Sequence, residues 1–339
     1  MRRPDVPHPS KADRPERSGG APHKSEPFES YFDVPVVGGA VTVARAGSPP
    51  GAGRPVVLVI HGMTSSHMVF RSVARELGRT ARGVCLLAPD LRGRGRSANL
   101  SGPYGMAAHI ADLVAVLDRA GVDRAIVVGH SIGGDIAARF AADHPERTAA
   151  LVLLDGGLPL RSEAVEGPND DDDQGGEGPG LLARIETTLD RLEKRAATVD
   201  EYVAYWRYHP SMVSAWDEDI DAYVRTDFVA DEDGVRCTVK LMPVLTDLTD
   251  LALDGVTRTA ITRVRAPVRL IRAERGVFDD DPVIPPAELE AFLPDHPNVS
   301  VEFVPGVNHY TLIMGGGHGP GRVARTLAAV AAEHSPARP

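Results

Sequence analysis

Ser131 lies at the centre of the pattern G-x-S-x-G at positions 129–133. The apolar residues 125–128 before it are typical of a short buried strand, and residues 132–143 after it are typical of a helix. A serine on a sharp turn between a strand and a helix exposes its hydroxyl at the edge of the sheet, and glycines on both sides allow strand and helix to cross closely. Ser131 is therefore the candidate nucleophile of a covalent mechanism.

A serine nucleophile needs a base that accepts its proton and donors that stabilise the oxyanion formed on the substrate. His309 is the best placed of the twelve histidines, because it follows a predicted strand at 299–304 and can lie over the carboxyl edge of a parallel sheet, where active sites of α/β proteins lie. The backbone N–H groups of Met63 and Ile132 are expected to form the oxyanion hole.

Short apolar strands alternate with helical segments along the chain, which predicts an α/β fold with a mostly parallel central sheet and helices on both faces. The expected strands are 56–60, 84–88, 125–128, 151–154, 268–271 and 299–304, preceded by a hairpin of 31–37 and 40–45. The expected helices include 68–79, 106–120 and 132–143. This arrangement brings Ser131 and His309 to the same edge of the sheet.

Composition divides the chain into parts. Residues 1–27 are rich in proline, glycine and charge and are expected to be disordered. Residues 28–160 and 260–335 carry the strands and are expected to form the core domain. Residues 161–259 begin with an acidic tract at Glu163–Gly180, expected to be a flexible loop, and continue with aromatic-rich sequence, expected to form a helical cap.

The composition of the 339 residues also restricts the class of function. No apolar run approaches the roughly 18 residues that span a bilayer, and the N-terminus lacks the apolar region of a secretion signal, so we expect a cytoplasmic protein without a membrane partner. The net charge of −10 disfavours nucleic-acid binding. The two cysteines, Cys85 and Cys237, predict no disulfide framework. The patterns of phosphate loops, dinucleotide sites and metal ligands are lacking, so neither a cofactor nor a metal is expected.

Four motifs, each after a predicted strand and in one chain order, resemble the α/β-hydrolase superfamily, specifically its cap-bearing serine esterase and lipase-like branch. The resemblance covers roughly residues 30–335. The arginines of the second motif are expected to anchor its loop rather than bind an anion. The motifs are His61-Gly62, the D-x-R-G-x-G-x-S sequence at 90–97, the turn at Ser131, and Val307-Asn308-His309-Tyr310.

The resemblance implies a serine hydrolase that cleaves a carboxylic ester, a thioester or a lactone through an acyl-enzyme intermediate. Ser131 would be the nucleophile and His309 the base. Cofactor-free haloperoxidases and carbon–carbon bond hydrolases of the superfamily keep the same triad and stay open, as does a non-catalytic ligand-binding member of the fold. Epoxide hydrolases and haloalkane dehalogenases place an aspartate at the turn, and Ser131 argues against both.

In the α/β-hydrolase superfamily, the acidic member of the triad usually follows the strand that corresponds to 268–271 here, in a G-x-x-D turn. Ala273 and Gly276 occupy the positions of that glycine and that aspartate, so the usual position is empty. A longer loop favours Asp279, which preserves the chain order of the triad. The alternatives are Asp280, Asp281, Glu274, and Asp155, which ends the strand after the helix at 132–143.

Substrate contacts are expected from the loops and from the cap. Both tryptophans and four of the seven tyrosines lie between residues 200 and 225, and part of this aromatic surface is expected to face a small apolar or aromatic ester-like substrate. His61 and His130 are expected to be polar groups that orient loops. The protein is expected to act as a monomer or a homodimer. The expected substrate-binding residues are His61, Gly62, His130, Trp206 and Tyr310.

Overall fold

The computed structural model describes residues 26–335 except 52, 160–186 and 188. The expectations for residues 1–25 and for the acidic tract at Glu163–Gly180 lie outside the described residues.

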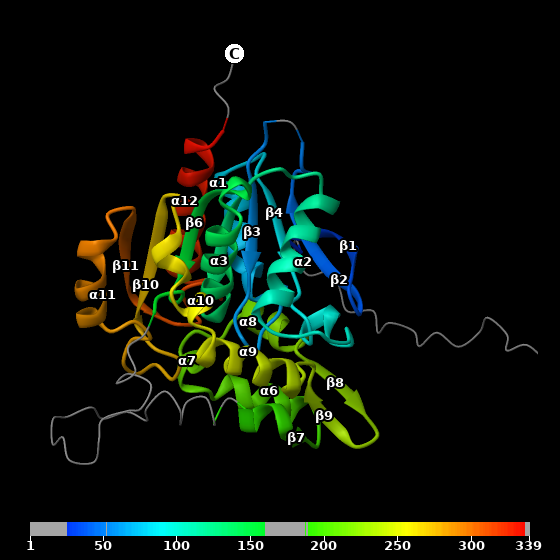
Figure 1. Cartoon of the computed structure of the whole chain (residues 1–339). Coiled ribbons are helices and arrows are strands. Elements are labelled where there is room, and N and C mark those ends of the chain that lie inside the picture. The colour runs from blue at the N-terminus through cyan, green and yellow to red at the C-terminus, as the bar shows by residue number, and fades with distance from the viewer. Residues whose placement is uncertain (1–25, 52, 160–186, 188, 336–339) are drawn as a thin grey trace, which may run out of the picture.

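An eight-stranded sheet forms the centre of the described structure, in the order β1-β2-β4-β3-β5-β6-β10-β11 (Figure 1). β2 pairs antiparallel with β1 and with β4, and the other neighbours are parallel, as the sequence predicts. The strands are β1 (Phe28–Val36), β2 (Gly39–Gly47), β3 (Val56–Ile60), β4 (Cys85–Pro89), β5 (Ala125–His130), β6 (Thr148–Leu154), β10 (Val268–Arg275) and β11 (Val299–Asn308).

The central strands are continuous apolar runs because both of their faces are buried. In β3, Val57 and Val59 belong to the hydrophobic cluster on one face of the sheet, whereas Val56, Leu58 and Ile60 belong to the cluster on the other face. This alternation is the two-residue period of a strand. Each strand therefore contributes to two cores at once.

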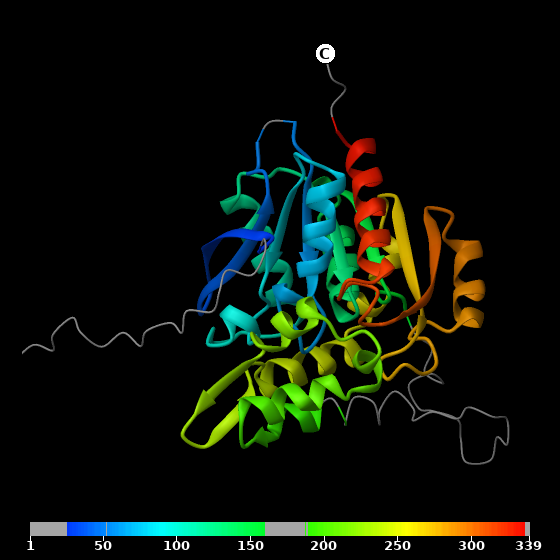
Figure 2. The same cartoon turned by 180° about the vertical axis from the view of Figure 1, so that it is seen from behind.

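Helices cover both faces of the sheet (Figures 1 and 2). α1 (Arg71–Thr80) and α12 (His318–Glu333) pack on one face, and α2 (Met106–Arg119) and α3 (Ile132–Asp143) on the other. α11 (Pro286–Phe292) lies between β10 and β11 in the chain. The helix expected at 68–79 begins as a 3-10 turn, His67–Phe70, and becomes α-helical only at α1.

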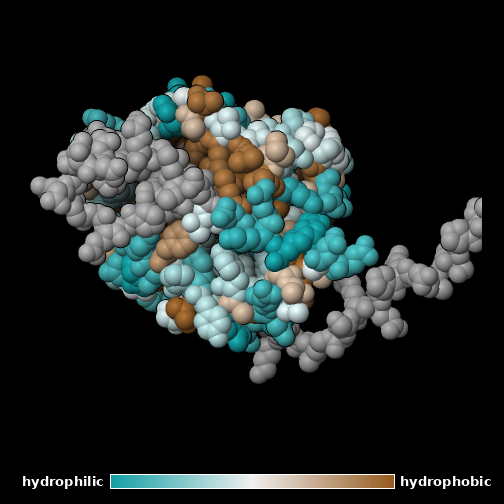
Figure 3. Space-filling model, turned by 90° about the horizontal axis from the view of Figure 1, so that it is seen from below, coloured by the Kyte–Doolittle hydropathy of each residue, from teal (hydrophilic) through white to brown (hydrophobic). Residues whose placement is uncertain are grey.

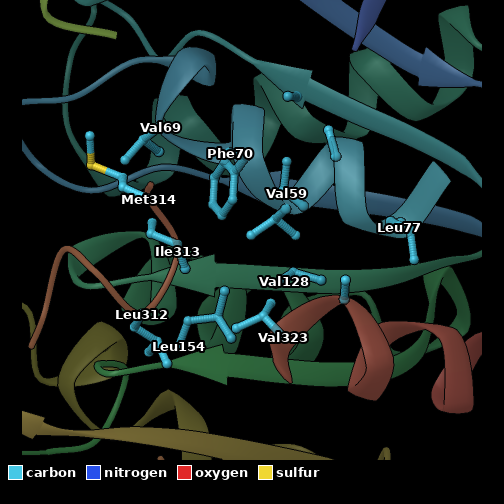
Figure 4. Packing of buried hydrophobic residues seen from close by; sticks show 14 of the residues in the cluster. Val59, Val69, Phe70, Leu77, Val128, Leu154, Leu312, Ile313, Met314 and Val323 are labelled. Atoms are coloured by element: carbon cyan, nitrogen blue, oxygen red, sulfur yellow. The ribbon is translucent and has the colours of Figure 1, made fainter. Parts of the chain in front are cut away.

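Figure 4 shows how tightly the α1–α12 face is packed. Phe70 lies beside Val59 of β3, and Val323 of α12 lies beside Val128 of β5. Through Val128 this core reaches β5, the strand that ends at Ser131.

The chain leaves the sheet between β6 and β10, and we call residues 189–263 the inserted segment. It lies below the sheet in both views of Figures 1 and 2. The sequence predicted only helices here, but the segment also contains a small sheet in the order β7-β9-β8. Its elements are β7 (Arg195–Ala196), α6 (Val199–Arg207), α7 (Pro210–Val213), α8 (Glu218–Val224), β8 (Phe228–Asp231), β9 (Gly234–Cys237), α9 (Leu241–Leu253) and α10 (Gly255–Arg258).

Local signals explain these elements. α6 begins with a reciprocal cap, in which the Thr198 side chain accepts from Glu201 N and the Glu201 carboxylate accepts from Ala197 N. The β8–β9 hairpin turns at Gly234, whose φ of +116° favours glycine. The turn is closed by Asp231, which accepts from Asp233 N.

The inserted segment contacts the core on both faces, with α10 against α3 on one and α8 against α1 on the α1–α12 face. Tyr202, Trp206, Ile220 and Tyr223 share one hydrophobic cluster with the sheet residues of that face. The side of the segment that faces away from the sheet carries a brown apolar area among polar ones (Figure 3). The exposed large apolar side chains of the segment are Tyr205, Tyr208, Val213, Val229, Met242, Leu253 and Val256.

Both cysteines, Cys85 and Cys237, are buried and free. In the part of the chain that the structure describes, no helix is both long and apolar enough to cross a membrane. The same described part contains no group of three or more His, Cys, Asp or Glu side chains that could hold a metal ion.

Candidate active site

Ser131 joins β5 to α3 with φ 56° and ψ −131°. This left-handed region is uncommon for a residue with a side chain and costs on the order of 1–3 kcal/mol. The backbone N–H of Ser131 donates to Leu154 O of the neighbouring strand at 3.1 Å, which holds the turn. Such a turn exposes the serine hydroxyl at the edge of the sheet.

The glycines around Ser131 are required by close backbone contacts. A Cβ on Gly133 would lie 2.3 Å from Ile60 O, and a Cβ on Gly129 would lie 2.0 Å from Gly133 O. A third close contact comes from β6, since a Cβ on Gly156 would lie 2.4 Å from Ser131 O. The glycines of the G-x-S-x-G pattern are therefore needed because a larger residue would block the close approach of α3 to β5 and β3.

His309 follows β11 and is buried, and its Nδ1 lies 2.7 Å from Asp155 Oδ2. The other carboxylate oxygen of Asp155 accepts from Ala273 N at 3.1 Å. Since a carboxylate accepts hydrogen bonds, Nδ1 of His309 carries the proton and Nε2 is the acceptor nitrogen. Asp155 fixes both the tautomer and the orientation of the ring.

His130 ties Ser131 to the loop of His309. Its Nε2 donates to His309 O at 3.0 Å, and the two imidazole rings lie 4.4 Å apart. Burial, together with the nearby His309, holds the pKa of His130 well below its usual range, so the ring is a neutral donor. Among the described residues no hydrogen bond joins Ser131 Oγ to His309, and catalytic hydrogen bonds are often longer without substrate.

His61 fixes the peptide that follows β3. Its Nδ1 donates to Gly62 O at 2.8 Å, and its Nε2 accepts from Leu91 N at 3.0 Å. Burial lowers the pKa of His61 to about 4, which keeps it neutral in this tautomer. The N–H of Met63 belongs to the peptide whose carbonyl His61 holds. That peptide lies beside the nucleophile, because a Cβ on Gly62 would lie 3.3 Å from Ser131 Cβ.

The loop at 90–97 is anchored by its charged residues, as expected. Arg92 forms a bidentate pair with Asp112 at 2.5 and 2.6 Å, and both are buried. Arg94 donates from Nε to Met63 O at 2.9 Å. Asp90 is fully buried and accepts backbone N–H groups on both carboxylate oxygens. These arginines therefore hold loops, including the one that contains Met63.

The structure corrects the first choice for the acid beside His309. Asp279 accepts from Arg275 Nε and from Asn308 Nδ2, each at 2.8 Å, and does not contact the imidazole. Its carboxylate is neutralised by an arginine four residues earlier, at the end of a strand that runs four residues further than predicted. Asp155, one of the alternatives, holds the position instead.

The remaining acidic alternatives bind other groups or face solvent. Glu274 is exposed and accepts from Gly306 N at 2.7 Å while it pairs with Arg275. Asp280 accepts from Phe278 N at 3.3 Å. Asp281 is exposed.

A sequence signal for Asp155 exists in its neighbours. Asp155-Gly156 directly follows β6, which pairs with β5, the strand of the nucleophile. The glycine permits close contact with the backbone of Ser131. An aspartate in this position is held within reach of the histidine.

Aromatic rings surround the far side of His309. Tyr310 lies 5.5 Å from the His309 ring, 6.3 Å from Trp206 and 6.0 Å from His209, measured between centroids. Burial raises the pKa of Tyr310 to about 12 and lowers that of His209 to about 4, so both are neutral. Beyond His209 an open groove is lined by Glu201, Ala204, Tyr205, Tyr208, His209, Pro210 and Phe278.

Comparison with known proteins bears on the fold. Residues 55–185 match the family model described as the alpha/beta hydrolase fold. The solved structure of E-2-(acetamidomethylene)succinate hydrolase aligns with a TM-score of 0.68 at 21% identity, covering 89% of this chain and 98% of that one. The chain has the α/β-hydrolase fold. Both comparisons agree with the resemblance expected from the four motifs at the level of the fold.

Curated proteins match a shorter part of this α/β-hydrolase-fold chain. Lipase LipV of Mycobacterium tuberculosis is 39% identical over 117 residues, which are 34% of this chain and 42% of the relative. Putative carbamate hydrolase RutD of Caulobacter vibrioides is 38% identical over 108 residues, which are 32% of this chain and 39% of the relative. The chain thus spans about two fifths of the length of these relatives.

Proposed function

We propose that the protein is a serine hydrolase that cleaves a carboxylic ester, or a related thioester or lactone, through an acyl-enzyme intermediate. One observation carries the proposal. The strained turn at Ser131 follows β5, and the side chains of Asp155 after β6 and His309 after β11 meet at 2.7 Å on the same edge of the sheet. Ser131 is the nucleophile, His309 the base, and Asp155 the acid that orients the base.

The tautomer of His309 determines the path of the proton. With Nδ1–H of His309 donating to Asp155, Nε2 accepts the proton of the Ser131 hydroxyl as the hydroxyl oxygen attacks the carbonyl carbon. The protonated ring then gives this proton to the leaving alkoxide or thiolate. Water attacks the acyl-enzyme by the same route and returns Ser131 to its free form.

The oxyanion of each tetrahedral intermediate is bound by the N–H groups of Met63 and Ile132. Ile132 is the first residue of α3, where N–H groups are free and the helix dipole favours negative charge. His61 and Arg94 hold the two carbonyls that flank Met63. Removing one oxyanion donor in a serine hydrolase costs about 10²–10³ in kcat.

The substrate is small and carries an apolar or aromatic group. Tyr310 lies next to His309, Trp206 lies beside Tyr310, and the groove that contains Tyr205 and Phe278 begins beyond His209. We propose that the inserted segment acts as a cap whose rings contact this group.

A panel of p-nitrophenyl esters of increasing acyl length tests the function, together with a fluorophosphonate probe. We expect turnover of at least one ester and a single labelled residue, Ser131. Ser131→Ala should abolish labelling and lower kcat by several orders of magnitude, because the triad acts as a unit. Ser300→Ala, a serine on the surface of β11, serves as the matched control. Labelling that persists in Ser131→Ala would contradict the proposal.

A further inference from the structure

Three successive residues of the loop after β3 are each held by a buried polar side chain. Ser65 contacts Tyr223, Thr64 contacts Arg191, and Met63 contacts Arg94. Tyr223 and Arg191 belong to the inserted segment, and the third contact depends on it through an ion pair. The inserted segment therefore holds the loop after β3, which contains the proposed oxyanion donor Met63.

The most direct contact is between two hydroxyls. Tyr223 of α8 and Ser65 lie 3.2 Å apart, and both side chains are buried. Burial raises the pKa of Tyr223 well above its usual range, so the phenol stays protonated and keeps its donor. The hydrogen bond between these two hydroxyls joins α8 to the loop after β3.

A second contact comes from a buried charge network. Arg191 donates from Nη2 to Thr64 O at 3.4 Å and pairs through Nη1 with Asp227 at 3.2 Å. Tyr202 donates to the same Asp227 at 2.8 Å without contacting the loop. The guanidinium lies over the ring of Trp206, 4.8 Å from its centroid. Because Asp227 neutralises the guanidinium, Arg191 keeps a fixed position against the loop.

The third contact passes through Arg94. This residue donates to Met63 O and forms an ion pair at 2.6 Å with Asp247 of α9. Asp247 also accepts from His109 of α2 at 3.0 Å. All three charged or polar side chains are fully buried, so the position of the guanidinium depends on a carboxylate that the inserted segment provides.

We propose that the inserted segment positions the oxyanion-binding peptide of this enzyme, with Tyr223 as the most direct positioning residue. The inference rests on the proposed function, because it assigns a purpose to the loop of Met63. The segment acts on the reaction without contacting the reacting atoms. It holds the peptide between Gly62 and Met63 at the distance that the oxyanion requires, where small displacements reduce the rate strongly.

Tyr223→Phe tests this because it removes one hydroxyl and keeps the ring. With the best p-nitrophenyl ester we expect kcat to fall about three- to tenfold, the range of one net hydrogen bond, while KM stays within about twofold. Thr257→Val is the matched control, since it removes a buried hydroxyl of the same segment that donates to Asp254 and contacts neither the loop nor the Arg191 network. The control should lose stability and keep kcat.

A double-mutant cycle with Ser65→Ala identifies the partner. Ser65→Ala should lower kcat as much as Tyr223→Phe, and the double variant should lower it no further. A trifluoromethyl ketone, which forms an oxyanion on the serine, should bind more weakly by the same factor as kcat/KM falls. If Tyr223 had a purely structural role, Tyr223→Phe would lower the melting temperature but would leave both kcat/KM and the affinity for the trifluoromethyl ketone unchanged.

The outcomes separate the two proposals. If the wild-type protein were active and the Tyr223→Phe variant kept its kcat, whether or not its KM changed, this inference would be overturned and the proposed function would remain intact. An equal loss of kcat in Thr257→Val would overturn it too. A wild-type protein that neither turned over esters nor reacted with fluorophosphonate would overturn both.

Discussion

Asp155 reaches His309 from β6, the strand next to the one that ends at Ser131, and their side chains meet at 2.7 Å across 154 residues of sequence. Asp155 has a φ of 50°, so the aspartate and the serine both sit in left-handed turns at adjacent strand ends. Two strained residues side by side at the edge of a sheet mark a place where geometry has been favoured over stability.

Substitution of the acid distinguishes Asp155 from Asp279. Asp155→Asn should lower turnover by about 10⁴, because an amide stabilises the wrong tautomer of His309 and cannot stabilise its protonated form. Asp279→Asn is the matched control and should keep activity within a few-fold. Steady-state kinetics on folded variants measure both. A large loss only in Asp279→Asn would return the acid to the loop after β10.

Substitution by alanine should have opposite effects on stability at two glycines, one in the nucleophile turn and one in α1. Gly133→Ala should prevent folding or lower stability by several kcal/mol, because its Cβ would lie 2.3 Å from Ile60 O. Gly78→Ala, in α1 with open space around it, should raise stability by about 0.5–1 kcal/mol. Urea unfolding of both variants provides the comparison. Equal effects would show that the crossing of β5 and α3 tolerates a side chain.

His61 predicts a loss of stability in acid. Its folded pKa of about 4 lies below the ordinary value of 6.5, so between these pH values the unfolded chain binds a proton that the folded chain does not. The free energy of unfolding therefore falls as pH drops from 6.5 to 4, by up to about 3 kcal/mol from this group. His61→Asn should flatten that part of the pH profile.

The control for this measurement is His318→Asn, at an exposed histidine on α12. Its urea-unfolding profile between pH 7 and pH 4 should run parallel to that of the wild type. A His61→Asn profile that also ran parallel would mean that His61 does not titrate in this range.

The contact between α8 and α1 depends on Asp219. This buried carboxylate accepts from Arg71 and Arg75 of α1, so Asp219→Ala leaves guanidinium groups without their counterion and should cost about 3–5 kcal/mol. Asp221→Ala, on the same helix, removes only a surface pair with Arg225 and should cost about 0.5 kcal/mol. Similar melting temperatures for both variants would contradict the assignment.

The sheet and the nucleophile turn could be predicted because their causes are local in sequence. β3 and α3 begin and end at the predicted residues, since a strand buried on both faces is a continuous apolar run and the turn needs its glycines. The small sheet of the inserted segment was missed for the converse reason. β7 has two residues and β8 is mostly exposed, so neither shows a strand pattern.

The acid could not be chosen from the sequence because several carboxylates lie at the correct edge of the sheet. Which one contacts His309 depends on partners that are remote in sequence. Asn308 holds Asp279 from 29 residues away, and the N–H of Ala273 orients Asp155 from 118 residues away. The contacts of the inserted segment with Thr64 and Ser65 are likewise invisible in the spacing of residues.

The placement of the acid on β6 has a consequence for variation in this protein. The loop from Gly276 to Ile284 has no contact with His309 through its carboxylates, yet Phe278 stacks on His209 at the groove, 5.3 Å between rings. The reacting groups and the ring of Phe278 can therefore change independently, whereas Asp279 accepts from Asn308, the neighbour of His309. A library randomised only at Val277 and Phe278 would sample new ester preferences while each member inherits an intact His309–Asp155 pair, which makes these two positions the natural starting point for redesign.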